Sequence, residues 1–278
     1  MSIHEHGGAP PLLAGFLVIL FVAGMAIFPL LHGWLFSRFK SQDPVRAAVL
    51  FAPLYLALEW LLTWALTGFP WVAAGYGQLE SPLAALAPVG GVELVSFDAI
   101  CSGLALALGV MGWRDGVRSR ARFAVLTAIL LAPWVLAGLA GQVTWVQPGT
   151  SRTVALVQGN VAQATKWHSE NRLPIIQRYR TLTEPHWGAD LILWPEAAIT
   201  VFEHQAGELL ADLDARGQAA GSGLILGLPA MRAYPGEEYA FLNTAIGLGT
   251  AEGRYVKRRL VPFGEYEPLE DLLRGLIQ

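Results

Sequence analysis

Glu196 is the residue whose type and setting best suit chemistry. It follows a short uncharged apolar run, residues 191–194, which is typical of a buried strand. Pro195 has no N–H to give to a sheet ladder, so we expect the strand to stop before it. Open α/β sheets bind ligands at the carboxyl ends of their strands, and a partly desolvated carboxylate there is a candidate general base. The alternative is a Glu that caps a following helix, and spacing alone does not separate the two.

A second stretch, Tyr255-Val-Lys-Arg-Arg-Leu-Val-Pro-Phe-Gly-Glu-Tyr-Glu-Pro268, carries further candidate residues. Together with Trp194-Pro195-Glu196, it resembles the nitrilase, or carbon–nitrogen hydrolase, superfamily, whose members use a Glu–Lys–Cys triad. The two motifs look most like the apolipoprotein N-acyltransferase family, which is the membrane-bound branch. Leu66-Thr-Gly-Phe-Pro-Trp71 and Gly75-Tyr76 are also similar to that family, so the resemblance extends through the whole chain.

The resemblance implies roles for five residues. Glu196 would be the general base, and Lys257 the cation that stabilises an oxyanion. Glu265 would be a second active-site carboxylate; the alternative is a loop Glu that accepts backbone N–H groups. Trp167 would shape an acyl pocket, with plain packing as the alternative. Trp71 would line a lipid path, with the interfacial aromatic belt as the alternative.

The nucleophile of the family is a cysteine on another strand, expected several tens of residues after the lysine motif. The sequence contains one cysteine, Cys101, which lies inside an apolar span and is remote from Glu196 in the chain. We therefore expect the nucleophilic cysteine to be absent from this chain. We also expect an internal fragment that lacks both ends of the family pattern and has no turnover alone.

Composition indicates a membrane protein with a globular part. Of the 278 residues, 54% are hydrophobic and 15% charged, and the apolar residues concentrate in the first half. The net charge of −3 argues against a nucleic-acid partner. The histidines lack metal-ligand spacing, and no phosphate or dinucleotide glycine motif occurs, so we expect no metal and no cofactor. Ser222 lacks the full nucleophile-elbow motif of serine hydrolases.

Four apolar stretches are long enough to cross a bilayer as helices, which takes roughly 20 residues each. They are residues 12–36, 47–66, 89–113 and 123–141. Basic residues follow the first and third stretches, so by the positive-inside tendency both of these loops are cytoplasmic and the region after 141 lies outside. A re-entrant segment is the alternative and would reverse this orientation. The acids within the spans are expected to pair structurally inside the bundle: Glu59, Glu93 and Asp98.

Beyond residue 143, short strands alternate with amphipathic helices, which indicates an α/β sheet with covering helices. We expect strands at 153–158, 191–194, 224–228 and 241–248, the last paired with the region of Tyr255, and helices at 171–182 and 203–219. A Pro/Gly loop should follow residue 228. The resemblance implies a nitrilase-like four-layer αββα sandwich, here incomplete. The expected domains are a transmembrane helical region, 1–149, and the N-terminal part of a periplasmic nitrilase-like domain, 150–278.

The resemblance also implies an acyltransferase of lipoprotein maturation at the outer face of a bacterial inner membrane. A phospholipid would donate its acyl chain to the cysteine as a thioester. The α-amino group of the diacylglyceryl-cysteine of an apolipoprotein would accept it. The alternatives are a membrane-tethered amidase or nitrilase, in which water replaces the amine, and a non-catalytic lipid-binding paralogue.

Overall fold

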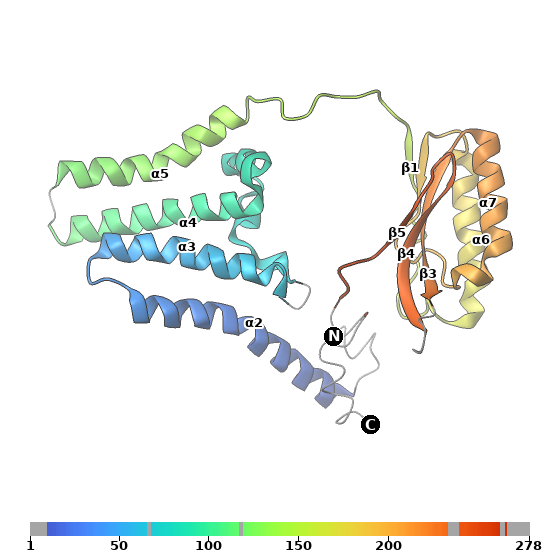
Figure 1. The fold of residues 1–278 in the computed structure, drawn as a ribbon, viewed down its shortest axis with the longest axis horizontal. Helices are drawn as coiled ribbons and strands as arrows, with labels where there is room; N and C mark the ends of the chain where they lie inside the picture. The colour runs from blue at the N-terminus through green and yellow to red at the C-terminus, as the bar shows by residue number, and fades with distance from the viewer. Residues whose placement is uncertain (1–9, 66–67, 117–118, 233–238, 262–264, 266–278) are drawn as a thin grey trace. The chain divides into compact units, whose positions relative to one another are not determined.

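A computed structural model describes residues 10–65, 68–116, 119–232, 239–261 and 265 (Figure 1). The described chain divides into two compact units, formed mainly by residues 15–147 and 148–260. The first unit is helical, and the second is built on a single sheet. The predicted change from a helical region to an α/β region is therefore confirmed.

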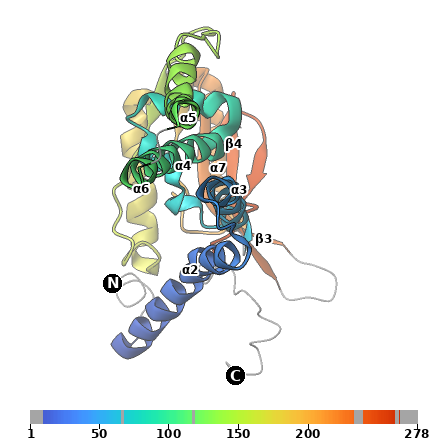
Figure 2. The same cartoon turned by 90° about the vertical axis from the view of Figure 1, so that its left-hand side faces the viewer.

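The helical unit contains four helices that are long and apolar enough to cross a membrane, and each overlaps a predicted span. They are α2 (Pro11–Phe39), α3 (Pro44–Leu62), α4 (Ala87–Arg114) and α5 (Arg120–Ala140). Asp43 and Ser119 cap α3 and α5, because their side chains accept the backbone N–H groups of Arg46 and Arg122. Figures 1 and 2 both show α3, α4 and α5 side by side.

The outward surface of this unit is apolar. Its long helices expose large aliphatic and aromatic side chains along their length, among them Ile19, Leu30 and Val135. The buried contacts are fewer and involve small residues and leucines, as where Leu83 and Ala137 share one cluster. Such a surface is unusual in water but is the expected surface of helices surrounded by hydrocarbon.

Two polar side chains hold the loop that joins α3 to α4. Glu59 Oε2 accepts the N–H of Ala74 at 2.8 Å, and Ser96 Oγ accepts the N–H of Gly75 at 2.7 Å. Both donors belong to the short 3₁₀ helix η3 (Ala74–Gln78). Glu59 is a buried acid in an apolar helix, so a partner for its carboxylate is energetically necessary. The partner of Glu59 Oε2 is therefore loop backbone, and pairing inside the bundle stays a prediction.

The second unit is a five-stranded sheet with the strand order β1-β2-β3-β4-β5. The strands are β1 (Val154–Leu156), β2 (Leu191–Leu193), β3 (Gly223–Arg232), β4 (Ala240–Gly249) and β5 (Arg254–Val256). The first three run parallel, whereas β4 is antiparallel to both β3 and β5. Helices α6 (Arg172–Thr183) and α7 (Gly207–Ala220) lie together on one face (Figure 1). This mixed architecture confirms the predicted α/β class and fits a nitrilase-like fold.

The helix-covered face of the sheet forms the core. Ile192, Leu224, Leu226 and Leu228 have 0% exposure and pack with side chains of α6 and α7. In β3 the leucines alternate with residues that face the other side, as the two-residue period of a strand requires. Fully burying one such side chain contributes roughly 1.5–3 kcal/mol.

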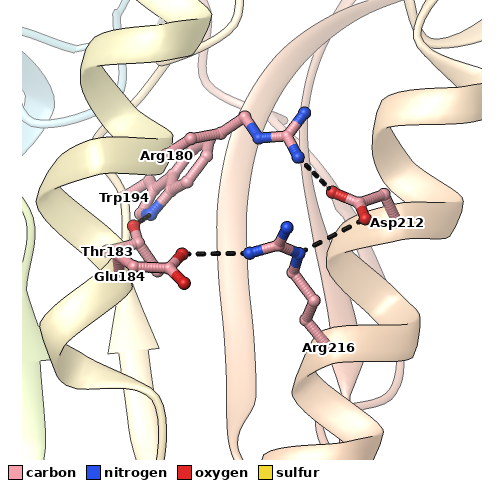
Figure 3. A network of polar contacts seen from close by, with 6 residues as sticks. All are labelled: Arg180, Thr183, Glu184, Trp194, Asp212 and Arg216. Atoms are coloured by element: carbon pink, nitrogen blue, oxygen red, sulfur yellow. Dashed lines mark hydrogen bonds and ion pairs between the residues drawn. The ribbon is translucent and has the colours of Figure 1, made fainter.

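Ion pairs join α7 to α6 and to the turn that follows α6 (Figure 3). Asp212 accepts Arg180 Nη2 at 2.6 Å and Arg216 Nε at 3.3 Å, while Arg216 Nη1 donates to Glu184 at 2.9 Å. All four side chains are at least a third exposed, so each pair contributes about 0.2–1 kcal/mol. The network therefore aligns the two helices more than it stabilises the fold.

One predicted boundary is wrong. A loop was expected after Leu228, but β3 continues through Pro229 to Arg232. The carbonyl of Gly227 accepts the N–H of Ile199 on the β2 side of the strand, so the nitrogen two residues later faces that side too. Because β2 pairs with β3 only as far as residue 225, a proline at this place removes no ladder hydrogen bond.

Candidate active site

Glu196 lies in a turn just beyond the end of β2, at the carboxyl edge of the parallel strands, as predicted. Trp194 is still tied to the sheet, because its N–H donates to the carbonyl of Ile225 at 2.9 Å. Pro195 then ends the strand, and the N–H of Ala198 closes the turn on the Pro195 carbonyl at 3.2 Å. The Glu196 side chain is 60% exposed, so it can meet a ligand.

Trp194 fixes the start of this turn from inside the unit. Its ring stacks on Tyr179 of α6, with 4.9 Å between ring centroids. Its indole N–H donates to Thr183 Oγ1 at 2.9 Å (Figure 3). The residue two positions before Glu196 is therefore locked by packing and by a buried hydrogen bond, which gives the carboxylate a rigid support.

Gly227 allows the turn to lie directly on β3. A Cβ at this position would lie 2.7 Å from the nitrogen of Ala197 and 2.9 Å from Cα of Glu196, which is too close for real atoms. Ala197 itself has a φ of +47°, in the left-handed region that side chains disfavour. The backbone that carries Glu196 thus depends on a glycine on the neighbouring strand.

The structure brings Lys257 to Glu196, although 61 positions separate them in the sequence. Lys257 directly follows β5, and its N–H donates to the Asn243 carbonyl at 2.8 Å, which extends the pairing with β4. Its Nζ donates to Glu196 Oε1 at 2.9 Å, a charge-assisted hydrogen bond. Two of the sequence candidates therefore form one constellation, and their catalytic roles remain predictions.

Asn243 is a site residue that the sequence did not indicate. Its Nδ2 donates to the same carboxylate oxygen as the lysine, Glu196 Oε1. The predicted pairing of strand 241–248 with the region of Tyr255 is confirmed. The sequence predicts that pairing without its register, and only the register shows that residue 243 lies beside residue 257.

Lys166 approaches Glu196 from the loop after β1. Its Nζ lies 3.4 Å from the main-chain carbonyl oxygen of Glu196. Partial burial lowers the pKa of Lys166, and the charge of Glu196 opposes part of that shift. The next residue, Trp167, is half-exposed and is not part of the buried core of this unit. Its role in an acyl pocket stays a prediction, but core packing does not account for the residue.

A cavity of about 570 Å³ lies beside the Glu196–Lys257 pair. Its apolar lining comes from three neighbouring strands, and two arginines that follow Lys257 add positive charge. The lining residues that matter here are Ile225, Ala245, Tyr255, Arg258 and Arg259. A pocket of mixed apolar and cationic character suits a ligand that has an apolar part and an anionic part.

Three other residues named from the sequence group with the helical unit. Trp71, in the 3₁₀ helix η2 (Pro70–Val72), is highly exposed, and Cys101 lies in α4. The carboxylate of Glu265 accepts the N–H of Val261 at 2.8 Å, a backbone contact of the kind given as its alternative reading. The Pro-Phe-Gly segment before Glu265 lies outside the described residues. Active-site roles for Trp71 and Glu265 stay predictions.

Two family descriptions match the chain. "Apolipoprotein N-acyltransferase N-terminal domain" matches residues 1–105, and "Carbon-nitrogen hydrolase" matches residues 153–278. The first match falls on the part of the chain that contains α2, α3 and most of α4. The second contains the whole described sheet and both members of the Glu196–Lys257 pair.

Curated relatives named apolipoprotein N-acyltransferase align with essentially the whole chain. Those of Pseudomonas syringae pv. tomato and Azotobacter vinelandii are each 42% identical, over 282 and 281 residues, which is 100% of this chain and 54% of the relative. That of Vibrio cholerae is 36% identical over 288 residues, covering 99% of this chain and 54% of the relative. The chain spans about half the length of the curated relatives that it matches. Over its whole length the chain is therefore similar to curated apolipoprotein N-acyltransferases, and its second part is similar to the carbon–nitrogen hydrolases.

Proposed function

We propose that this chain is part of an N-acyltransferase of lipoprotein maturation. The enzyme moves an acyl chain from a phospholipid, through a cysteine thioester, to the α-amino group of the diacylglyceryl-cysteine of an apolipoprotein. The observation that carries the proposal is the contact between Glu196 Oε1 and Lys257 Nζ beside a cavity, in a chain whose described residues include four membrane-compatible helices. The names and similarity of the relatives support the same activity.

The chemistry follows from the two charged groups. Glu196 takes the thiol proton of the nucleophilic cysteine, and the thiolate attacks the ester carbonyl of the phospholipid. Lys257 stabilises the oxyanion, and Glu196 returns the proton to the leaving alcohol as the ester bond breaks. The amine of the acceptor then attacks the thioester, gives a proton to Glu196, and releases the cysteine as the thiol. A membrane bundle suits this reaction, because donor and acceptor are both lipid-anchored.

The supporting residues and the placement in the cell belong to the same proposal. Trp167 shapes the acyl pocket, Trp71 lines the lipid path, and Glu265 steadies the lysine or the nucleophile. Residues 1–149 form the transmembrane region, and residues 150–278 form the first part of a nitrilase-like domain in the periplasm. The basic loops after α2 and α4 support this orientation in a bacterial inner membrane.

The competing function is hydrolysis of a small amide, favoured by the general match to carbon–nitrogen hydrolases. A direct comparison separates the two, using a chain extended through a nucleophilic cysteine and reconstituted with phospholipid. Transfer of a labelled acyl chain to the amine of a diacylglyceryl-cysteine peptide, through a hydroxylamine-sensitive adduct on the enzyme, is the expected result. Release of ammonia from small amides without transfer to the peptide would replace the proposal with an amidase.

The orientation has a separate test. A reporter active only in the cytoplasm should be silent when fused directly after the sheet unit. The same reporter should be active when it is inserted in the loop between α4 and α5. Activity at the first position would overturn the periplasmic assignment without bearing on the chemistry.

A further inference from the structure

The two oxygens of the Glu196 carboxylate are in different surroundings. Oε1 accepts hydrogen bonds from both Lys257 Nζ, at 2.9 Å, and Asn243 Nδ2. Among the residues that the structure describes, none donates to Oε2. Among the described donors, therefore, two hold Oε1 and none contacts Oε2.

This asymmetry is built into the sheet. Lys257 and Asn243 are neighbours on paired strands, and the N–H of Lys257 donates to the Asn243 carbonyl at 2.8 Å. Both residues line the cavity. The adjacent Thr244 also contributes to the lining, but it is buried and its hydroxyl is engaged, since it donates to the Leu228 carbonyl at 2.7 Å. Two donors that come from fixed backbone positions preorganise the oxygen they share.

The two donors are not equivalent. The ammonium of Lys257 is carried by a long, flexible side chain, and in the proposed reaction it must also move to stabilise the oxyanion. The amide of Asn243 is neutral, has a short side chain and leaves the strand at a fixed point. The amide is therefore the donor able to keep Oε1 occupied while the lysine shifts toward the reacting centre.

We propose that Asn243 is a positioning residue that holds Oε1 of Glu196, so that Oε2 is the atom that takes and returns the proton. The inference rests on the proposed role of Glu196 as general base. The proton leaves the cysteine sulfur and binds Oε2, which gives a neutral carboxylic acid whose Oε1 still accepts from Asn243. The same Oε2–H then donates to the leaving alkoxide, so the acid does not have to rotate between the two transfers.

The test uses a chain extended through a nucleophilic cysteine and two variants, Asn243→Ala and Asn243→Asp. The first readout is the rate of cysteine alkylation by iodoacetamide as a function of pH. This rate depends on removal of the thiol proton by the general base and requires no lipid substrate. Loss of a hydrogen bond to a charged acceptor should move the acid limb of this profile up by about one pH unit in Asn243→Ala. The added carboxylate of Asn243→Asp should move it further in the same direction.

The second readout is acyl transfer. Misplaced proton transfer should lower kcat of Asn243→Ala by about tenfold to a hundredfold, with KM for the phospholipid little changed. Gln218→Ala is the matched control, because Gln218 is also a side-chain amide donor, but its Nε2 donates from helix α7 to the backbone carbonyl of Gly249 on β4 and not to the Glu196 carboxylate. That control should lose a similar amount of thermal stability without any shift of the alkylation profile.

The outcomes separate the inference from the function beneath it. One outcome is that Asn243→Ala and Asn243→Asp differ from the parent chain only by a lower melting temperature and show the same pH profile of alkylation. In that case Asn243 is merely structural and the inference fails. If the profile shifts but no variant, the parent included, transfers acyl groups, the inference holds and the proposed acyl-transfer reaction fails. A lower kcat/KM for acyl transfer in Asn243→Ala, with an unshifted pH profile of alkylation, also overturns the inference.

Discussion

The two faces of the sheet use the same strands for different purposes. On the face under α6 and α7, Leu224, Leu226 and Leu228 are fully buried. On the other face, the residues between them meet the Glu196 turn and line the cavity, as Ile225 and Gly227 do. Because side chains alternate along a strand, two adjacent residues lie on opposite faces, and substituting one or the other is expected to have different effects.

The comparison shows how a small unit can separate folding from chemistry. The covered face supplies hydrophobic stabilisation, and it fixes Trp194, from which the turn starts. The open face can then carry charged and exposed groups, such as the Glu196–Lys257 pair, at little expense in stability. Substitutions on the open face should therefore lower activity, and those on the covered face should lower stability.

The largest effect is expected at the open face. Glu196→Gln should lower the rate of thioester formation by about 10²–10⁴-fold, because the variant has no base for the thiol proton. Lys257→Met should lower it by about 10²–10³-fold through loss of oxyanion stabilisation. Both would be measured as acyl-enzyme yield over time in a chain extended through the cysteine.

Thermal unfolding in detergent provides the control for these two variants. Glu196 is mostly exposed, so melting temperatures close to that of the parent chain are expected. A rate equal to the parent rate in either variant would remove that residue from the mechanism. A large fall in melting temperature would break the separation between the two faces.

The next effect belongs to the covered face. Leu226→Ala should destabilise the unit by about 2–5 kcal/mol, because it removes a fully buried side chain and leaves a cavity. Ile225→Ala, one residue away on the open face, is the matched control and should lose less. Denaturant unfolding followed by tryptophan fluorescence measures both. Equal losses at the two positions would contradict the comparison.

A third substitution acts across the sheet, from a strand to the turn that it supports. Gly227→Ala places a methyl group against the backbone at Ala197 and Glu196, so the turn must move. A displacement of the base by about 1 Å can lower activity by about a hundredfold. Gly207→Ala, at the start of α7, has open space around the added methyl group and should be close to neutral. Initial rates of acyl transfer, with melting temperature beside them, distinguish the two.

The sequence indicates much of this arrangement but not all of it. Apolar length predicts the four long helices, and Pro195 correctly predicts where β2 stops. The role of Asn243 as a neighbour of Glu196 depends on the register of two antiparallel strands, which no local pattern encodes. The proline at 229 looks like a strand terminator from sequence, and only the early end of β2 makes it harmless. Local signals thus predict elements, whereas the site depends on how distant elements pair.

The smallest expected effect concerns the two ends of β2 rather than the two faces of the sheet. Asp190 stands just before the strand, at the end opposite Glu196. Its carboxylate accepts the N–H of Thr153 at 2.7 Å and pairs with Arg152 at 2.9 Å, which ties β1 to β2. The Thr153 N–H, followed by Arg152, lowers the pKa of Asp190 to about 2. This is a structural carboxylate, whereas the one at the other end of the strand faces a cavity.

A lowered pKa in the folded state fixes the sign of the pH dependence. Asp190 stabilises the fold above the pKa of an unfolded aspartate, about 4, and this contribution is lost as pH falls from about 4 toward 2. The melting temperature of the parent chain should therefore fall more steeply over that interval than that of Asp190→Asn, which cannot titrate. Because the group is well exposed, added salt should reduce the difference. If the melting temperatures of the two proteins fell equally between pH 5 and pH 2, the Asp190 carboxylate would not be what ties the two strands together.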